Sequence, residues 1–324
     1  MHVTPVVYSC VLPRVCADYR VQTSDGLSAF DGVTFPSDEV KIFGFLGPHG
    51  AGKSTTISML STYLPPTSGD ALIDGHSIIR DAYKVKQIIG VVPQDIALYP
   101  TLTAIQNLRF YGRMYDMDGD ELDSRCKELL DLVELWDRRD SRIDQFSAGM
   151  KRRINMAAGL LHHPRFLLLD EPTVGVDPQS REHIFETIFR IRDSGTTILY
   201  TSHYMEEVEL LCDYIAIMDK GKMMAGGTLQ ELLGMLGEGG VIELEVSPPG
   251  CPAGLAQQIN EQNGVTAVSR LDEKFTISSK NSAHSLPPVL KVLEDSGCEV
   301  SHLEIYTPNL EKLFIHLTGK ELRE

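Results

Sequence analysis

The sequence predicts an α/β protein with a parallel sheet and helices on its faces, followed by a small C-terminal α+β domain. Three short apolar runs, at residues 41–47, 165–171 and 196–202, alternate with helical stretches. Such alternation is typical of a parallel sheet. A glycine-rich loop follows the first run, and the stretch at 237–240 marks a break in composition. We therefore expect a nucleotide-binding domain over residues 1–236 and an accessory or regulatory domain over 241–324.

The bulk composition excludes several classes of protein. The chain has 324 residues, which is enough for sizeable cores. Its net charge of −15 argues against a general nucleic-acid binder, which needs a basic face. No segment reaches the roughly 18 apolar residues of a membrane-spanning helix, and the N-terminal stretch is not expected to be a signal peptide. The six cysteines form no CxxC pair, which predicts reduced cytosolic thiols.

The elements of the first domain can be taken in order. Residues 15–35 read as two strands around a Ser-Asp-Gly turn, which predicts a hairpin. The apolar run at 41–47 is a strand that leads straight into glycines and a Ser/Thr-rich helix start. A long helical region is expected from about 103 to 133.

The second domain shows a different succession of elements. Its segments VIELEV, GLAQQINEQ, VTAVSRL, KFTISS, VLKVLEDSG and HLEIY suggest the order β-α-β-β-α-β. That order is typical of a ferredoxin-like domain. A last helix is expected from Pro308, with one apolar face formed by Leu310, Leu313, Phe314 and Leu317.

The segment GPHGAGKST fits the phosphate-loop pattern G-x-x-x-x-G-K-[ST] between a strand and a helix. Glycines let successive backbone N–H groups point at phosphate oxygens, and the helix adds its dipole. Lys53 is expected to reach the β- and γ-phosphates, Ser54 to ligate Mg²⁺ and Thr55 to bond the α-phosphate. The residues predicted to bind ATP or GTP here are Gly47, Pro48, His49, Gly50, Ala51, Gly52, Lys53, Ser54 and Thr55.

Polar side chains follow three further apolar runs. Asp170 and Glu171 end the run at 166–169, where Asp170 would hold Mg²⁺ and Glu171 would accept a proton from the attacking water. Two acids at a strand exit are commonplace on surfaces, but the phosphate loop upstream favours the functional interpretation. His203 follows the run at 196–202, at the sheet edge that binds ligands in open α/β proteins. Gln94 follows VVP and is a weak signal by itself, and the His162–His163 pair is assigned no function.

In chain order, the sequence shows GPHGAGKST, VVPQ, FSAGMKRR, FLLLDEP, TVGVD and TSH. This set resembles the ATP-binding cassette of ABC transporters, with its Walker A, Q-loop, signature, Walker B, D-loop and switch histidine. The resemblance covers residues 15–233. It implies a P-loop NTPase fold with a RecA-like core, an antiparallel β subdomain and a helical subdomain. The implied cofactors are ATP and Mg²⁺.

The resemblance also explains why the signature lies so far along the chain from the phosphate loop. In that family two cassettes pair head to tail, and each signature contacts the nucleotide of the other subunit. It implies that Ser147 and Gly149 contact the γ-phosphate held by a partner cassette, while Asp177 signals across the dimer. The basic residues 151–153 are interpreted as a solvated helix start. The second cassette would be another copy of this chain or a close relative.

The remaining site roles are likewise implied by the resemblance. Glu171 would be the catalytic base, and His203 would hold the γ-phosphate. Gln94 would sense Mg²⁺ as a ligand, contact the attacking water and couple to a permease. Tyr19 is the candidate for stacking on adenine, although aromatic residues in strands more often belong to a core.

The sequence departs from the usual cassette motifs at three places, and some of its segments resemble one branch of the family. Ala148 stands where glycine is usual, His49 stands where asparagine is common, and the turn before residue 41 lacks its usual glycine. None of the three removes a catalytic group, and Ala148 is expected to affect only efficiency, by tightening the backbone near the partner's phosphate. The segments GMKRR, EPTVGVDPQSR and TSHYMEEVELLCDYIAIMDKGKMMAGGTLQEL resemble cassettes of bacterial daunorubicin-resistance-type exporters.

This likeness implies an ATPase subunit that drives a separate transmembrane permease from the cytoplasmic face of the membrane and exports drugs or similar amphiphiles. The alternative is a free-standing soluble ABC ATPase. Chromosome-associated cassettes would carry a coiled coil between the Walker motifs, and no sustained heptads occur between residues 56 and 166. Translation-associated proteins would carry two cassettes, and a small-molecule kinase has no use for the signature. The cargo cannot be read from this chain.

Overall fold

A computed structural model describes residues 15–20, 33–34, 41–236, 239–247, 252, 254–279 and 281–319. The chain divides into two compact units, one reaching to Gly226 and one beginning at Gly227. The division lies before helix α8 (Leu229–Gly234), which the sequence analysis placed in the first domain. The two units are described separately below.

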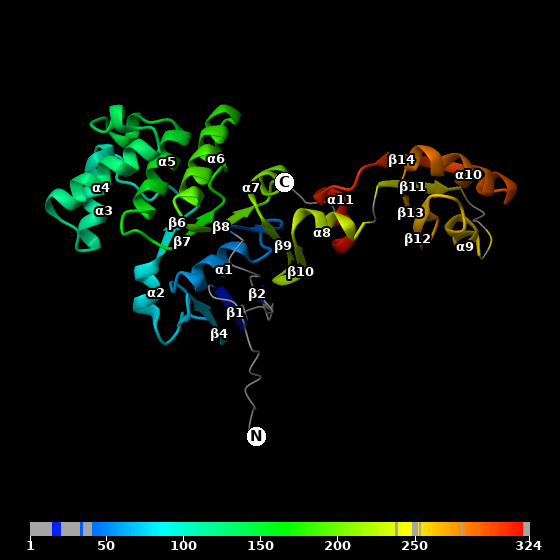
Figure 1. Cartoon of the computed structure of the whole chain (residues 1–324), viewed down its shortest axis with the longest axis horizontal. Helices are drawn as coiled ribbons and strands as arrows, with labels where there is room; N and C mark the ends of the chain where they lie inside the picture. Colours follow the sequence, from blue (N-terminus) through cyan, green and yellow to red (C-terminus); the bar gives the residue numbers. More distant parts are fainter. Residues whose placement is uncertain are drawn as a thin grey trace, which may run out of the picture. The chain divides into compact units, whose positions relative to one another are not determined.

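A six-stranded sheet forms the centre of the first unit (Figure 1). Strand β3 pairs in parallel with both β8 and β9, and β7 pairs in parallel with β6 and β8. The order across the sheet is β10 (Lys222–Gly227), β9 (Tyr214–Asp219), β3 (Ile42–Leu46), β8 (Thr197–Ser202), β7 (Phe166–Asp170) and β6 (Ile89–Val92). The predicted parallel sheet is confirmed, because all three apolar runs named above are strands in it.

Helices cover both faces of this sheet because alternate side chains of each strand point to opposite faces. Phe43 and Phe45 of β3 belong to one buried cluster with residues of α1 (Lys53–Leu60). On the opposite side of β3, Gly44 lies against α7 (Met205–Leu211) and the residue after it. A Cβ at Gly44 would come within 3.0 Å of Val208. Two further helices of this unit are α2 (Ala82–Ile88) and α6 (Pro178–Asp193).

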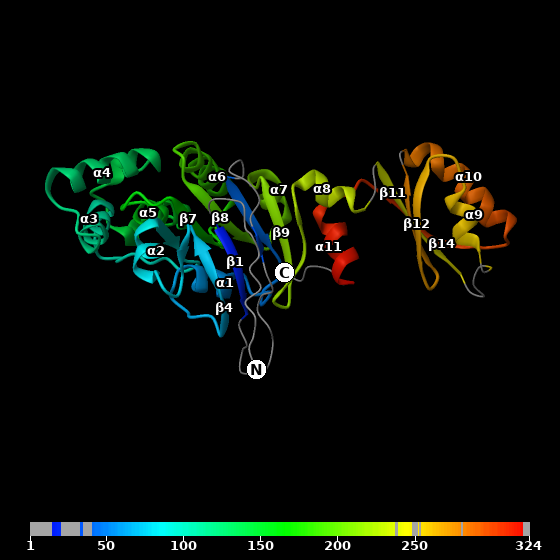
Figure 2. The ribbon, with the colours of Figure 1, turned by 60° about the horizontal axis from the view of Figure 1, so that its bottom comes forward.

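The expected antiparallel β subdomain is present. Its sheet has the order β2 (Val33–Thr34), β1 (Val15–Arg20), β4 (Ser68–Ile73) and β5 (His76–Ser77). Strands β1 and β2 pair antiparallel, as the predicted hairpin requires, while the turn between them lies outside the described residues. Figure 2 shows this sheet next to α1, which connects it to the phosphate loop.

The helical subdomain contains α3 (Ala104–Met114), α4 (Gly119–Leu132) and α5 (Ala148–Gly159). Short 3₁₀ turns at Trp136–Arg138 and Ile143–Gln145 lie between α4 and α5. The predicted helical region therefore splits in two. Asp116 adopts a left-handed φ of 59°, and the N–H of Met117 closes the end of α3 on the carbonyl of Gly112.

The second unit contains a four-stranded antiparallel sheet, and its elements follow the expected order. They are β11 (Gly240–Val246), α9 (Leu255–Asn260), β12 (Val265–Leu271), β13 (Lys274–Ser279), α10 (Ser282–Asp295) and β14 (Val300–Tyr306). The order across the sheet is β12-β13-β11-β14. A final helix, α11 (Leu310–Thr318), buries three of the four apolar residues named for it, and Leu317 is half-buried.

The cysteines and the helix lengths bear on two expectations for the whole chain. Among the cysteines whose side chains are described, Cys126 and Cys212 are free and buried, but Cys298 is disulfide-bonded. The prediction that every cysteine is a reduced thiol is therefore wrong for Cys298. None of the described helices is both long enough and apolar enough to cross a membrane.

Candidate nucleotide site

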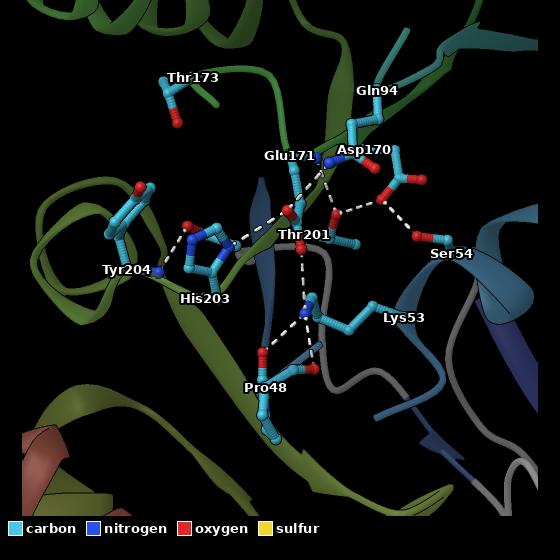
Figure 3. Close-up of polar contacts among 12 residues, drawn as sticks. Pro48, Lys53, Ser54, Gln94, Asp170, Glu171, Thr173, Thr201, His203 and Tyr204 are labelled. Atoms are coloured by element: carbon cyan, nitrogen blue, oxygen red, sulfur yellow. Dashed lines mark hydrogen bonds and ion pairs between the residues drawn. The ribbon is translucent and has the colours of Figure 1, made fainter. Parts of the chain in front are cut away.

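Several of the predicted site residues lie together at one edge of the central sheet (Figure 3), namely Lys53, Ser54, Gln94, Asp170, Glu171 and His203. Parallel strands end at the same edge, so the segments that follow them become neighbours. The phosphate loop follows β3, Gln94 follows β6, Asp170 ends β7 and His203 follows β8. Contacts between segments far apart in the sequence thus assemble the site.

The phosphate loop depends on its glycines for two different reasons. Gly50 and Gly52 have φ values of 78° and 107°, in the left-handed region that side chains rarely adopt. At Gly47 the constraint is space, because a Cβ there would lie 2.4 Å from the carbonyl oxygen of Met218. The loop therefore presents bare backbone to a ligand, as phosphate binding requires.

Lys53, the first residue of α1, is 4% exposed. Its ammonium donates to the carbonyl oxygens of Gly47 at 2.6 Å and Pro48 at 3.1 Å. The same group forms an ion pair with Glu171 Oε1 at 3.1 Å. Lys53 therefore joins the two ends of the site, and its charge is directed into the loop where phosphates would lie.

Thr201 positions both acids at the end of β7, and sequence reasoning missed it. Its hydroxyl donates to Asp170 Oδ1 at 2.7 Å and accepts the N–H of Glu171 at 3.0 Å. Ser54 also donates to Asp170 Oδ1, at 3.1 Å. The available signal was a threonine directly after the apolar residues 198–200, at a position where Thr201 is fully buried.

The Ser54 hydroxyl and the Asp170 carboxylate are hard oxygen donors that already lie next to one another. Oxygen ligands of this kind suit Mg²⁺, which is normally held through one or two carboxylates plus the phosphates of its substrate. The residues present therefore fit the ion that the fold implies. The contact found for Gln94 is to the neighbouring acid, since its amide nitrogen lies 3.4 Å from Glu171 Oε2. Its predicted role as a Mg²⁺ ligand stays a prediction.

Glu171 and His203 are in direct contact. His203 Nδ1 lies 3.1 Å from Glu171 Oε2, and both side chains are largely buried. A carboxylate can only accept, so the proton of this hydrogen bond lies on Nδ1. Burial lowers the pKa of His203, Glu171 opposes that shift, and the neighbouring His49 and Lys53 add to it. The rings of His49 and His203 are 4.6 Å apart.

The signature segment lies at the start of α5. Ser147 is exposed and caps the helix by accepting the N–H of Met150 at 3.2 Å. Gly149 is buried, and a Cβ there would lie 2.4 Å from the Cβ of Ser180 on α6. Asp177 is exposed and caps α6, and this hydrogen bond to the Ser180 N–H lowers its pKa.

The interpretation of residues 151–153 as a solvated helix start is wrong for Arg152. This side chain is 5% exposed and donates to the carbonyl oxygens of Pro93 at 3.1 Å and Gln94 at 2.6 Å. It therefore connects the signature helix to the Q-loop. A basic run at a helix start could not reveal this, because the partners are backbone atoms of a distant segment.

The structure does not test the predicted roles of Tyr19 and Thr55. Tyr19 lies in β1 opposite Gly69, but its side chain lies outside the described part of the chain. Thr55 is half-buried in the first turn of α1. Their roles toward adenine and the α-phosphate stay predictions.

The similarity of this chain to known proteins shows both its family and its fold. The ABC transporter family model matches residues 30–174. The linearmycin resistance ATP-binding protein LnrL of Bacillus subtilis (strain 168) is 46% identical over 294 residues, covering 90% of this chain and 94% of that protein. The daunorubicin resistance ATP-binding protein DrrA3 of Streptomyces coeruleorubidus is 35% identical, covering 91% and 92%. The solved ATP-binding cassette MJ0796, a post-hydrolysis dimer bound to ADP and phosphate, has a TM-score of 0.59 and 25% identity, covering 66% of this chain and 98% of that one.

Proposed function

The chain belongs to the ABC transporter family as an ATP-binding subunit, and from that membership we propose that it drives a separate transmembrane permease that exports drugs or similar amphiphilic compounds. ATP hydrolysis is the activity of this family. Its relatives at 46% and 35% identity are named for linearmycin and daunorubicin resistance. The observation that carries the catalytic part is Glu171, buried between Lys53 and His203 beside the Ser54–Asp170 pair.

Binding of ATP would use the phosphate loop and Lys53. Phosphate oxygens are stronger acceptors for an ammonium than backbone carbonyls are, so Lys53 would turn from Gly47 and Pro48 toward the β- and γ-phosphates. That movement releases Oε1 of Glu171 from its ion pair. Ser54 and Asp170 would hold Mg²⁺, which supplies positive charge against the phosphate oxygens when bound.

Hydrolysis would then depend on Glu171 and His203. A released Glu171 carboxylate can accept a proton from water, a contribution of roughly 10²- to 10⁴-fold in rate. His203 would hold the γ-phosphate through its ring. Because Nδ1 donates to Glu171, the other ring nitrogen needs a proton of its own before it can donate to phosphate. Gln94 lies beside Glu171 and would orient the water.

The second half of each site would come from another cassette. Ser147 is exposed at the start of α5, where backbone N–H groups and the helix dipole favour an anion. We propose that Ser147 and Gly149 contact the γ-phosphate of a partner, in a dimer like that of MJ0796. Asp177, exposed at the start of α6, would face the same interface.

Affinity purification of the tagged chain from detergent-solubilised membranes tests the transport role. We expect one polytopic membrane protein to be recovered with it, and that partner would place the chain at the cytoplasmic face of the membrane. A strain that expresses the tag alone is the control. Recovery of soluble protein only, with ATP-driven dimerisation intact, would mean a free-standing cassette ATPase and would overturn the exporter assignment.

A further inference from the structure

A buried carboxylate outside the predicted site joins two of its segments. Glu207 of α7 is 2% exposed. Its Oε2 accepts hydrogen bonds from Thr173 Oγ1 at 2.9 Å, Tyr200 Oη at 2.7 Å and Ser202 Oγ at 2.8 Å. Burial raises the pKa of Tyr200, and Glu207 adds to this effect, so the tyrosine retains the proton that it donates. A buried acid with three donors around one oxygen is a specific arrangement.

These bonds reach both segments next to the γ-phosphate position. Ser202 donates to Glu207 and also accepts the N–H of Tyr204 at 2.9 Å, so its hydroxyl holds the backbone on both sides of His203. Thr173 follows Glu171, the proposed catalytic base, by two positions and begins the loop that ends at Asp177. Glu207 therefore connects the switch-histidine segment to the D-loop.

Glu207 has a fourth neighbour, Arg181, which lies close to it without forming a hydrogen bond. Arg181, in the first turn of α6, places its Nε 3.4 Å from Glu207 Oε1. Both atoms are buried, and neither has a hydrogen-bond partner among the described residues. The Arg181 guanidinium also lies 5.1 Å from the centre of the Tyr204 ring. A buried donor and acceptor this close need only a small movement of α6 to form a direct hydrogen bond.

We propose that Glu207 is a positioning residue for ATP hydrolysis, which holds His203 and the 173–177 loop in one arrangement. Arg181 is the residue that couples movement at the start of α6 to the Glu207 carboxylate. When the D-loop shifts, the Arg181–Glu207 bond forms or opens, and the switch histidine moves with it. This inference rests on the catalytic roles proposed above for Glu171 and His203.

The test compares Glu207→Gln with Glu206→Gln in the purified full chain. Both changes remove one carboxylate from the same helix, but Glu206 is exposed. We expect Glu207→Gln to lower kcat for ATP about tenfold, because displacing a catalytic group by a fraction of an ångström has effects of this order. KM and the affinity for ATP should match those of Glu206→Gln. Equal kcat values for the two variants would overturn the proposal.

A second variant keeps the test open if Glu207→Gln does not fold. The Arg181 side chain is 31% exposed, so Arg181→Gln is compatible with folding. It should lower kcat without changing ATP affinity, and the double variant should be no slower than Glu207→Gln alone. Unchanged kcat in Arg181→Gln, or additive losses, would contradict the proposal.

Glu171→Gln separates this inference from the proposed function. If the unmodified chain hydrolyses ATP and Glu171→Gln does not, the catalytic assignment stands, and a fully active Glu207→Gln counts against Glu207 alone. If Glu171→Gln is fully active, the proposed role of the catalytic base fails.

Discussion

At the scale of single residues, Glu171 is held in a conformation that few side chains adopt. Its φ is 43°, in the left-handed region, and the hydrogen bond from its N–H to Thr201 stabilises that backbone. Lys53 pairs with one carboxylate oxygen, and His203 and Gln94 contact the other. The Glu171 carboxylate is thus fixed in orientation by these contacts. It can act as a base only after ligand binding rearranges its partners.

His162 shows the opposite case of a histidine with a structural role. Its Nε2 lies 2.7 Å from the carbonyl oxygen of Ile89, and its ring stacks on Tyr115 at 3.9 Å. Burial lowers its pKa, and Arg125 and His163 act in the same direction. Sequence analysis assigned it no function, and the structure places it as a link between β6 and the end of α5.

This histidine predicts a specific dependence of stability on pH. Because the pKa of His162 is lower in the folded chain than in the unfolded one, the unfolded chain binds the proton more tightly. The stabilisation is therefore present above the ordinary pKa of about 6.5 and is lost as pH falls through the lower folded value. In urea unfolding, the native chain should lose more stability between pH 7.5 and 5.5 than His162→Gln does. Identical pH dependences would contradict this, and exposed His284→Gln is the control.

At the scale of elements, the start of α5 combines two functions that can be separated. Ser147 caps the helix, which normally contributes about 1 kcal/mol to stability. The same hydroxyl is proposed to contact the γ-phosphate of a partner cassette. A cap needs only a side-chain acceptor, whereas a phosphate contact needs a donor without negative charge.

Two substitutions at Ser147 distinguish these functions. Ser147→Ala should lower the free energy of unfolding by about 1 kcal/mol, and Ser147→Asp should keep that stability because aspartate is an equally good cap. Both should abolish ATP-driven dimerisation, the second because its charge repels the phosphate. Chemical unfolding and light scattering with ATP measure the two effects. Dimerisation that persists in Ser147→Asp would contradict the phosphate contact.

At the scale of the whole molecule, each unit has its own buried apolar cluster. The first includes Phe45, Leu60 and Leu168, and the second includes Ile242, Phe275 and Val289. Separate cores allow separate unfolding transitions. The nucleotide site lies entirely in the first unit, so a ligand should act on that unit alone.

Calorimetry of Glu171→Gln, which binds ATP without turnover in our proposal, checks this. With ATP and Mg²⁺ at a hundred times Kd, the transition of the first unit should gain about 2.7 kcal/mol and shift upward by several degrees. The transition of the second unit should not move. Lys53→Ala serves as the control and should show no shift. One transition that shifts as a whole would contradict independent unfolding.

The sequence by itself determined the parallel sheet, the phosphate loop, the two acids and the family, because each is written in adjacent residues. Glycine spacing, an apolar run and a carboxylate at the end of that run are local patterns that can be recognised in the sequence alone. It also placed His203 at the sheet edge that binds ligands, and the family resemblance assigned Lys53, Asp170, Glu171 and His203 to one nucleotide.

Only the tertiary structure decided which other side chains hold that site together. Thr201, Arg152 and Glu207 act through partners 31, 58 and 34 positions away in the chain. Each is an ordinary polar residue in its local context, so no pattern distinguishes it from a solvated one. Burial gives them their roles, because a buried polar group must find a partner, and that partner is set by packing rather than by neighbouring sequence.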